Sequence, residues 1–333
     1  MKAPFCAFAG SDIVMDLYAV SGKEGLLIDL GTNGELALSH QGKWFVSSAA
    51  CGPAFEGGNM ACGSPAVNGA IDKVWYDKTW HWHTISSAPA QSVCGSGYIS
   101  WIAGALDQDL LEESGYLSEE IELLPGIYLA RQDIRSFQMA KGALAAAIET
   151  LCSYARMRVS EIERIVIAGG FGQHLDPAHL CQLGFFPAGF SGTVECVGNR
   201  ALQGAARYAI LQDHKTIEEL IHRSVPVLLA VQSLFMERFA ANMQLSSKKR
   251  KDRDSFQKKY PLLHRHRYRA CKSMLKWRQR QIERFLEHFF NRMHRNDIQL
   301  VFDFLRNFMQ VGPVVPRNEH FGCLLYTSDA AAI

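Results

Sequence analysis

Short apolar runs alternate with longer amphipathic segments along the first three quarters of the chain. Uninterrupted or alternating apolar residues are typical of strands, and apolar residues that recur every three or four positions are typical of helices. Strands are therefore predicted in 25–31, in 35–49 with a break at a Gln-Gly turn, in 162–168 and at the start of 192–211. Helices are predicted over 10–20, the second half of 90–111, 133–157, the second half of 192–211 and the start of 216–231.

Helices separate these strands, and glycines stand where strands end. This alternation predicts an α/β domain, in which ligands gather at the carboxyl ends of the strands. Asp133 is expected to cap the longest helix, and Ser11 or Asp12 to cap the first. A glycine-rich segment covers 51–71, and an irregular acidic stretch precedes Asp133.

The net charge of +2 hides a division within the chain. Residues 1–245 carry 16 Lys and Arg against 25 Asp and Glu, whereas residues 246–333 carry 19 against 8. Hydrophobic residues make up 48% of the whole, which is enough for a sizeable core. We expect a mildly acidic globular body followed by a strongly basic appendix.

The basic region 246–333 has three interpretations: a nucleic-acid-binding arm, a solvated helix, or a stretch that does not continue the domain naturally. Its apolar residues are sparse and poorly periodic, and its final letters, "CLLYTSDAAAI", resemble translated adaptor sequence. We therefore favour a disordered or artefactual tail. Nucleic acid is not expected as a partner, and no function is assigned to this region.

Nine cysteines are scattered along the chain without a CxxC or CxxH pair. This spacing argues against a zinc ribbon, a plant-type ferredoxin cluster and a compact disulfide framework. No basic and apolar leader is present, and the longest apolar run falls far short of the roughly 20 residues that span a bilayer. A reducing cytoplasm is the expected location, with no membrane partner.

The segment "DLGTNGE" combines a strand end with two glycines. The amides from Gly31 to Gly34 are predicted to point into one concavity, because backbone N–H groups without bulky side chains suit a polyphosphate. Thr32 and Asn33 add side-chain donors. Asp29 would repel phosphate unless a divalent cation lay between them, so the motif predicts Mg²⁺ held through water. The alternative is an ordinary Asn-Gly hairpin with a solvated aspartate.

The second motif, "IVIAGGFGQH", is an apolar strand that ends in Gly169, Gly170 and Gly172. These glycines allow a flat ring or a ribose to lie against the main chain. The alternative is a Rossmann-type turn, but the third glycine of GxGxxG is missing and the chain contains no GxxxxGK[ST]. A phosphate hairpin followed, after a long helix, by an adenosine-type turn resembles the second lobe of the actin-like ATPases.

Six ordered segments extend this resemblance: "LLIDLGTNGELAL", "CGPAFEGGNMACG", "VCGSGYI", "DIRSFQMAKGAL", "IAGGFGQHLDP" and "VGNRALQGA". Over about residues 5–245 the chain resembles the reductive activators of corrinoid proteins. These ATP-dependent enzymes return Co(II) corrinoid to Co(I) for methyl transfer. The resemblance implies an actin-like, ribonuclease H-like second lobe, with a mixed sheet flanked by helices.

The resemblance also implies roles for individual residues. Contacts to the phosphates and Mg²⁺ would come from Asp29, Gly31, Thr32, Asn33 and Gly34. The nucleoside would lie on Gly169, Gly170 and Gly172, and Gln138 or Lys141 would reach the adenine. Asp29, as the metal residue, and Glu56 are the candidate catalytic residues. Glu56 would orient a Mg²⁺-bound water or meet the corrinoid protein, although it could equally cap the next helix.

Family members are longer and begin with an iron–sulfur domain and a first lobe that carries another phosphate motif. The resemblance therefore implies a fragment, in which 1–22 hold the connecting helix and the end of a missing first lobe, 23–245 the ATPase lobe and 246–333 the tail. ATP and Mg²⁺ are the expected ligands, and an iron–sulfur cluster is expected only in the missing domain. The expected partner is a corrinoid protein of a methyltransferase system, and the chain could also form a homodimer. The chain alone is expected to bind ATP weakly and to hydrolyse it slowly.

A second class remains open. Activators of hydroxyacyl-CoA dehydratases are actin-like ATPases that hold an iron–sulfur cluster with cysteines in glycine-rich turns, as Cys51, Cys62 and Cys94 are here. The simpler explanation is that a thiol is a small apolar group beside close-packed glycines. The turn 95–97 could face an anion at a helix start or be purely structural, and His174 is expected to be a hydrogen-bonded surface group.

Overall fold

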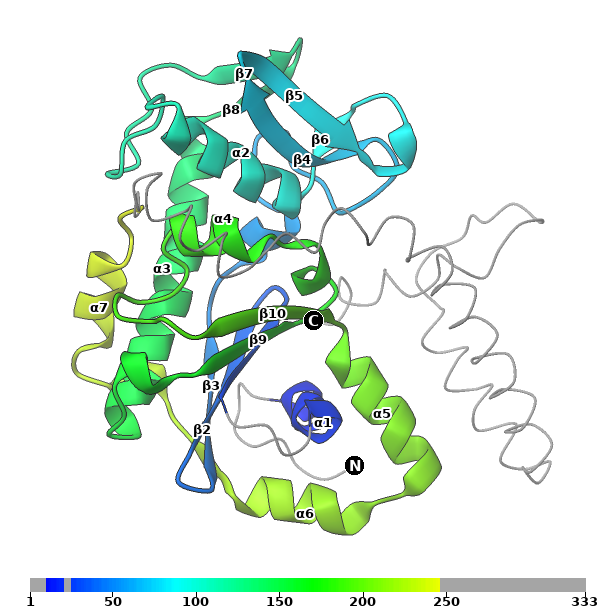
Figure 1. Cartoon of the computed structure of the whole chain (residues 1–333), viewed down its shortest axis with the longest axis vertical. Helices are drawn as coiled ribbons and strands as arrows, with labels where there is room; N and C mark the ends of the chain where they lie inside the picture. Colours follow the sequence, from blue (N-terminus) through cyan, green and yellow to red (C-terminus); the bar gives the residue numbers. More distant parts are fainter. Residues whose placement is uncertain (1–9, 21–24, 246–333) are drawn as a thin grey trace, which may run out of the picture. The chain divides into compact units, whose positions relative to one another are not determined.

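The computed structural model describes residues 10–20 and 25–245. The basic region 246–333, with the three interpretations of it, lies outside the described residues. The central feature is a six-stranded mixed sheet in the order β10-β9-β1-β2-β3-β11 (Figure 1). Its strands are β1 (Leu26–Leu30), β2 (Gly34–His40), β3 (Lys43–Ala49), β9 (Arg164–Ala168), β10 (Thr193–Gly198) and β11 (Ser224–Pro226).

The first three strands form the predicted meander. β1, β2 and β3 pair antiparallel, while β9 is parallel to β1, β10 to β9 and β11 to β3. The turn between β2 and β3 has positive φ at both Gln41 and Gly42 (49° and 73°), as a type I′ hairpin requires. This geometry matches the right-handed twist of the strands, so the predicted Gln-Gly turn is confirmed.

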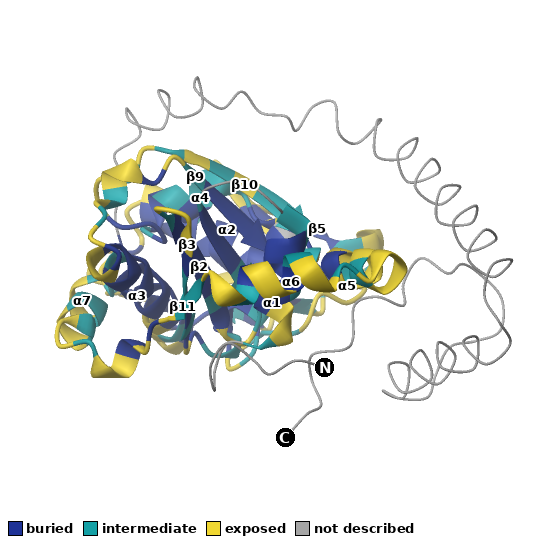
Figure 2. Ribbon diagram, turned by 90° about the horizontal axis from the view of Figure 1, so that it is seen from below, coloured by how far each residue is buried: buried dark blue, intermediate teal, exposed yellow. Residues whose placement is uncertain are grey.

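Both faces of the central sheet are buried, as the alternation along β1 shows. Leu26 and Ile28 point into a core shared with the long helix α3 (Arg131–Tyr154). Leu27, between them, points to the opposite face, where α1 (Ser11–Val20) and α6 (His214–His222) cover the sheet. In Figure 2 the buried strands lie between these helices, with the exposed side of α6 facing the viewer.

The described helices match most of the sequence predictions. α1 packs against α5 (Arg200–Leu211) and α6, and α3 packs against α7 (Phe235–Ala241). The remaining helical elements are α2 (Gly95–Asp107), α4 (Pro177–Gln182), η1 (Pro53–Glu56), η2 (Ile85–Ser87), η3 (Val159–Glu161), η4 (Gly172–His174) and η5 (Leu229–Val231). Within the described ranges, no helix combines the length and the apolar character needed to cross a lipid bilayer.

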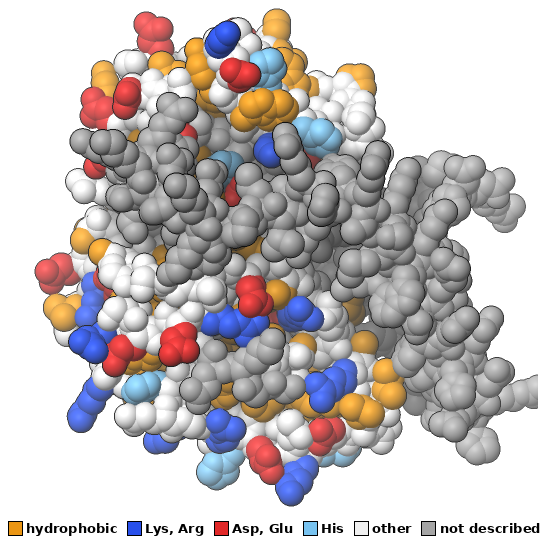
Figure 3. Space-filling model, viewed as in Figure 1, with side chains coloured by type: hydrophobic (Ala, Val, Ile, Leu, Met, Phe, Trp, Pro, Cys, Tyr) orange, Lys and Arg blue, Asp and Glu red, His pale blue; other side chains and the backbone are white. Residues whose placement is uncertain are grey.

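The sequence pattern did not predict a second sheet, of order β5-β4-β6. Its strands are β4 (Ala70–Asp77), β5 (Thr79–Thr84) and β6 (Ser92–Val93), and a further hairpin joins β7 (Ile121–Leu124) to β8 (Ile127–Leu129). The β4–β5 hairpin packs on α2, where the ring of Trp80 lies beside Gly104. Trp75, Tyr76 and Trp82 stay 36–42% exposed. Figure 3 shows hydrophobic and histidine side chains together at the top, where Figure 1 places this hairpin.

Candidate functional site

The two glycine motifs meet at one edge of the central sheet. β1 and β9 are parallel neighbours in which Asp29 pairs with Ala168, so their carboxyl ends lie side by side. Gly169 follows with φ of +92°, and a Cβ there would lie 2.5 Å from both Asp29 Oδ1 and the Leu30 carbonyl oxygen. Only glycine permits this approach. The structure thus brings the predicted phosphate turn and the predicted nucleoside turn into direct contact.

The turn from Gly31 to Asn33 connects β1 to β2. The Thr32 hydroxyl donates to Glu56 Oε2 over 2.9 Å, which joins this turn to the end of η1. Thr32 and Asn33 are exposed and available to a ligand. Two candidate residues that lie 24 positions apart, Thr32 and Glu56, are therefore adjacent in space.

The glycines of this turn contribute less than the sequence predicted. The amide of Gly31 donates to the Asn33 carbonyl oxygen over 3.0 Å, so it is used within the turn. Gly34 is buried as the first residue of β2, and a Cβ there would lie 3.0 Å from Cys51 Sγ. Thr32 and Asn33 are the exposed residues of the predicted concavity.

Sequence reasoning missed an acidic residue that faces Asp29. Asp16, on α1, is completely buried, and neither of its carboxylate oxygens has a hydrogen-bond donor among the described residues. Burial, reinforced by the charge of Asp29, raises the pKa of Asp16 to about 10. Two carboxyl groups can hydrogen-bond to each other only if one is protonated, so this pair carries a proton or needs a cation. The signal in the sequence was an acid one helical turn from the apolar Ile13.

Glu35 extends this acidic region. Burial, followed by the charge of Asp29, raises its pKa to about 7. Among the described residues, no group of three or more His, Cys, Asp or Glu side chains has the geometry to hold a metal ion. A cation beside Asp16 and Asp29 would therefore need water or a bound ligand to complete its coordination, which fits the oxygen-rich shell that Mg²⁺ prefers.

The nucleoside turn is tightly packed. Gly169 and Gly172 are buried, and Gly170 is partly exposed. A Cβ at Gly172 would lie 3.0 Å from Ile167 Cγ2, so this position also favours glycine. Phe171, between them, is half-buried and stacks on Phe55 with parallel rings.

The two candidates for the adenine are inside the protein. Gln138 is 4% exposed and its amide donates to the Ser114 carbonyl over 2.9 Å. Lys141 is 1% exposed, its ammonium donates to the Gln244 carbonyl, and burial lowers its pKa to about 8. Contact with an adenine would require either side chain to exchange its present bond.

The three cysteines of the glycine-rich turns each contact the protein. Burial raises the pKa of Cys51 to about 12. The Cys62 thiol donates to the Gly126 carbonyl over 3.4 Å, and Cys94 lies 3.4 Å from the Ser96 hydroxyl. These contacts are those of thiols packed as small apolar groups beside glycine. The six cysteines that the structure describes form no disulfide.

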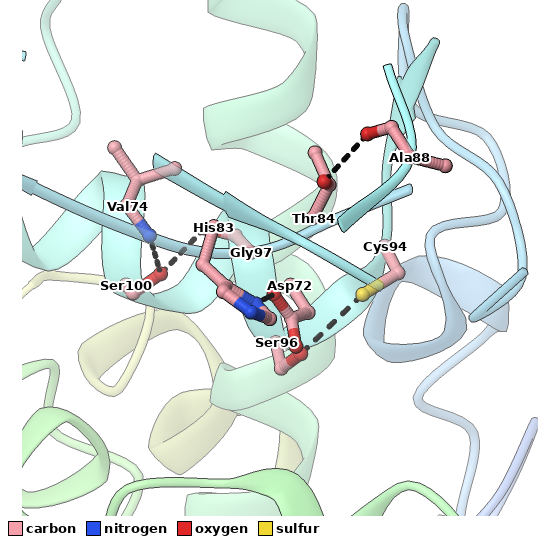
Figure 4. Close-up of polar contacts among 9 residues, drawn as sticks. All are labelled: Asp72, Val74, His83, Thr84, Ala88, Cys94, Ser96, Gly97 and Ser100. Carbon is pink, nitrogen blue, oxygen red and sulfur yellow. Dashed lines mark hydrogen bonds and ion pairs between the residues drawn. The ribbon is translucent and has the colours of Figure 1, made fainter. Parts of the chain in front are cut away.

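Gly95 to Gly97 form the first turn of α2, not a separate turn before it. All three residues are buried, and Ser100 in the next turn accepts from the Val74 amide and donates to the Gly97 carbonyl (Figure 4). Nearby, His83 pairs with Asp72 over 2.7 Å. The buried packing favours the structural interpretation of this turn over an anion site.

Asp133 acts from inside α3 and not from the position before it. It is the third residue of the helix, and its carboxylate accepts from the Ala130 amide over 3.0 Å. Its other oxygen accepts from the Ala61 amide over 2.7 Å, which ties the glycine-rich segment after η1 to α3. The predicted cap thus also holds the loop that follows Glu56.

Comparisons with known proteins agree with this geometry. A family model described as the C-terminal domain of RACo, the ASKHA domain, matches residues 23–257. The corrinoid activation enzyme RamQ of Eubacterium limosum is 29% identical over 268 residues, which are 71% of this chain and 45% of RamQ. The [Co(II) methylated amine-specific corrinoid protein] reductase of Methanosarcina barkeri is 28% identical over 59% of this chain and 40% of that protein.

A solved structure, the reductive activator for corrinoid, iron-sulfur protein, shares the fold with a TM-score of 0.66 and 24% identity. The match covers 74% of this chain and 44% of that one. The chain therefore spans less than half the length of the relatives it matches.

Proposed function

This chain belongs to the family of the C-terminal ASKHA domain of RACo, and from that premise we propose that it is the ATP-binding lobe of a reductive activator of corrinoid proteins. The observation that carries the proposal is the contact between Asp29 and Gly169. It joins a turn suited to phosphates with a turn suited to a nucleoside at the carboxyl ends of parallel strands, where α/β proteins bind ligands. Both relatives are named for corrinoid activation or reduction.

In this proposal the backbone amides of Thr32 and Asn33 and the Asn33 side chain contact the phosphates, because the hydroxyl proton of Thr32 is already donated to Glu56. Gly169, Gly170 and Gly172 let the nucleoside lie against the main chain. Gly31 and Gly34 shape the turn, because the amide of one is already bonded and the other is buried. Gln138 or Lys141 contacts the adenine after exchanging its carbonyl partner.

Mg²⁺ is assigned to the Asp29 carboxylate, with Asp16 behind it. The buried oxygens of Asp16 that lack a donor support this assignment, because a dication removes the cost of two adjacent carboxylates. Glu56 would orient a water bound to the metal through its position beside Thr32. The bound Mg²⁺ would supply charge neutralisation of the phosphates, while the protein residues position them.

The biological role follows from the relatives' names. Nucleotide binding would change how the lobe docks on a Co(II) corrinoid protein, and the difference in affinity between two docked states would drive a one-electron reduction to Co(I). The electron would come from a low-potential iron–sulfur cluster held outside the described residues. A cytoplasmic location is part of the proposal, supported by the absence of disulfides among the described cysteines.

An ATPase activator that carries its own iron–sulfur cluster is the second candidate. Cys62 is the observation that favours it, because it is partly exposed within the glycine-rich loop. Anaerobic reconstitution followed by iron analysis and a visible spectrum separates the two candidates. A colourless, iron-free chain removes the second.

A calorimetric titration of Mg-ATP into the chain tests the first proposal. We expect heat of binding from the parent and its loss in Asp29→Asn, while Asp109→Asn, at an exposed position, should bind as the parent does. Because the relatives extend beyond the matched segment, the titration is repeated with the amino-terminal segment of the Eubacterium limosum relative added. If the parent binds in neither case, the proposal is wrong.

A further inference from the structure

We propose that Phe55 and Phe171 are positioning residues, whose stacked rings join the nucleoside turn to Glu56 and hold its carboxylate on the Thr32 hydroxyl. The inference rests on the proposed function, since it gives Glu56 its role at the phosphate turn. It adds a physical connection between the two ends of the nucleotide site that does not run through the strands.

The two rings lie between the motifs. Phe171 belongs to the nucleoside turn, and Phe55 directly precedes Glu56 in η1. Their planes are 8° apart with centroids at 6.3 Å, an offset parallel arrangement that aromatic rings favour. The stack therefore connects Phe171 of the nucleoside turn to Phe55, the residue directly before Glu56.

The inner ring has little freedom to move. Phe55 is 1% exposed and contacts the rings of Phe185 and Phe137, with centroids 5.2 Å and 6.3 Å away. A close-packed ring cannot yield on one side without moving its own backbone. A displacement of Phe171 would therefore be passed to the main chain of η1.

Two further contacts hold that main chain. A Cβ at Gly95 would lie 1.6 Å from the Phe55 carbonyl oxygen and 2.8 Å from the Phe171 ring, so the start of α2 presses on both residues. After Glu56, Gly57 turns the chain with φ of 82°, and the Asp133 carboxylate holds the Ala61 amide. With its surroundings fixed, Glu56 takes its position from the Phe55 ring.

The Thr32–Glu56 hydrogen bond is the consequence at the other end. It is an exposed bond of 2.9 Å between two side chains, and such a bond forms only where its partners are already placed. A ligand that orders Phe171 would strengthen it, and loosening Phe171 would weaken it. Occupation of the nucleoside turn is thereby sensed at the phosphate turn.

Hydrogen exchange of the nucleotide-free chain tests this directly. Phe171→Leu keeps an apolar side chain but removes the ring. We expect the amide of Gly31, which donates to the Asn33 carbonyl within the phosphate turn, to exchange about 3- to 10-fold faster, which corresponds to the loss of one aromatic pair. Phe171→Tyr keeps the ring and should exchange at the parent rate. Phe190→Leu is the matched control, because this half-buried ring contacts Phe186 instead of Phe55.

The Thr32→Val background decides whether the effect runs through Glu56. Once the hydroxyl is gone, Phe171→Leu should add no further acceleration at the Gly31 amide. Acceleration that adds in full, or that appears equally in Phe190→Leu, would overturn the proposal. If Phe171→Leu is not recovered folded, Phe171→Met replaces it in the same comparisons.

The exchange measurement needs no nucleotide, so the two proposals fail separately. A parent that binds no Mg-ATP but shows the expected exchange pattern removes the proposed function and keeps the connection between the rings and the turn. If the parent binds Mg-ATP but Phe171→Leu exchanges at the parent rate, the proposed function stands and the connection between the rings and the turn is wrong. Where turnover is measurable, Phe171→Leu should lower kcat more than it raises KM.

Discussion

The completely buried carboxyl group of Asp16 lies against that of the half-buried Asp29, with no donor for either oxygen of Asp16 among the described residues. In an unfolded chain Asp16 would lose its proton near pH 3.8, whereas in the fold its pKa rises to about 10 through burial and the charge of Asp29. The folded state therefore binds the extra proton between these limits. Two ionised carboxylates would repel each other here, and a proton or a cation removes that repulsion.

The first prediction concerns stability against pH. Because the pKa of Asp16 is raised in the folded state, the protonated side chain favours folding. This stabilisation is fully present below about pH 4 and is lost as the pH rises toward 10, so the unfolding free energy falls by up to about 1.4 kcal/mol per pH unit. Asp16→Asn, which mimics the protonated carboxyl, should remove this downward slope from the dependence of the unfolding free energy on pH between 5 and 9, while Glu35 below pH 7 and Lys141 above pH 8 keep their own contributions. Urea unfolding at several pH values measures it.

Asp109→Asn serves as the control for this series, since Asp109 is exposed and lies outside the acidic region. Its profile should keep the slope of the parent. An Asp16→Asn profile as steep as that of the parent would show that another group titrates.

The second prediction concerns Gly169. Its φ of +92° and the 2.5 Å approaches of a Cβ to Asp29 and to the Leu30 carbonyl make alanine unacceptable. Gly169→Ala should lose about 2–4 kcal/mol of stability, combining backbone strain with overpacking. It should also lose Mg-ATP binding, because the two turns are forced apart.

Gly189→Ala provides a control with nearly the same backbone. Its φ is +93°, yet a Cβ there meets nothing within 4 Å. It should cost only the backbone strain, about 1 kcal/mol, and leave Mg-ATP binding intact. Thermal denaturation and calorimetry compare the pair; equal losses in both variants would mean that the contact with Asp29 is unimportant.

Much of this site followed from the sequence because its geometry is local. A strand that ends in Asp29 and turns over glycines can only place Thr32 and Asn33 at a strand end. The neighbourhood of Gly169 and Asp29 was expected from the resemblance to the actin-like ATPases, and the parallel pairing of β1 with β9 places the two residues together.

What the sequence left out depends on contacts between distant elements. Asp16 was not singled out from the sequence, because its burial and its contact with Asp29 arise only when α1 packs on the central sheet. Gln138 and Lys141 looked available because their partners come from distant segments: Gln138 bonds the Ser114 carbonyl, and Lys141 bonds the Gln244 carbonyl after α7. The β4–β5 hairpin was missed although its tryptophans and tyrosine are typical of strands, because both of its faces also carry polar residues.

The third prediction concerns the loop that follows Glu56. Asp133→Ala removes the acceptor for two amides, Ala61 and Ala130, and should lower the unfolding free energy by about 2–3 kcal/mol. Asp213→Ala, which removes the half-buried cap of α6 and its hydrogen bond to the Thr216 amide, should cost about 1 kcal/mol. Only the Asp133 variant should speed amide exchange at Ala61; equal exchange in both variants would leave Asp133 with a capping role alone.

The last prediction concerns Lys141 and separates its structural cost from its proposed contact with the adenine. Its pKa is lowered to about 8 by burial, so the folded chain loses this proton well before the unfolded one, and the stability that Lys141 removes is regained as the pH rises from 8 toward 10.5. Lys141→Met, which fills the same space without charge, should raise the unfolding free energy at pH 7 by about 1–2 kcal/mol after the bond to Gln244 is lost. The gain should shrink above pH 9.

Calorimetry with two nucleotides completes the test of Lys141. If its side chain exchanges the Gln244 carbonyl for the base, Lys141→Met should weaken Mg-ATP binding while leaving Mg-GTP binding unchanged, because only the contact with the base is removed. Gln138→Met tests in the same titrations whether Gln138 contacts the adenine. Parallel losses for both nucleotides in both variants would assign the two side chains to holding α3 against the Ser114 and Gln244 carbonyls, and would exclude them from adenine recognition.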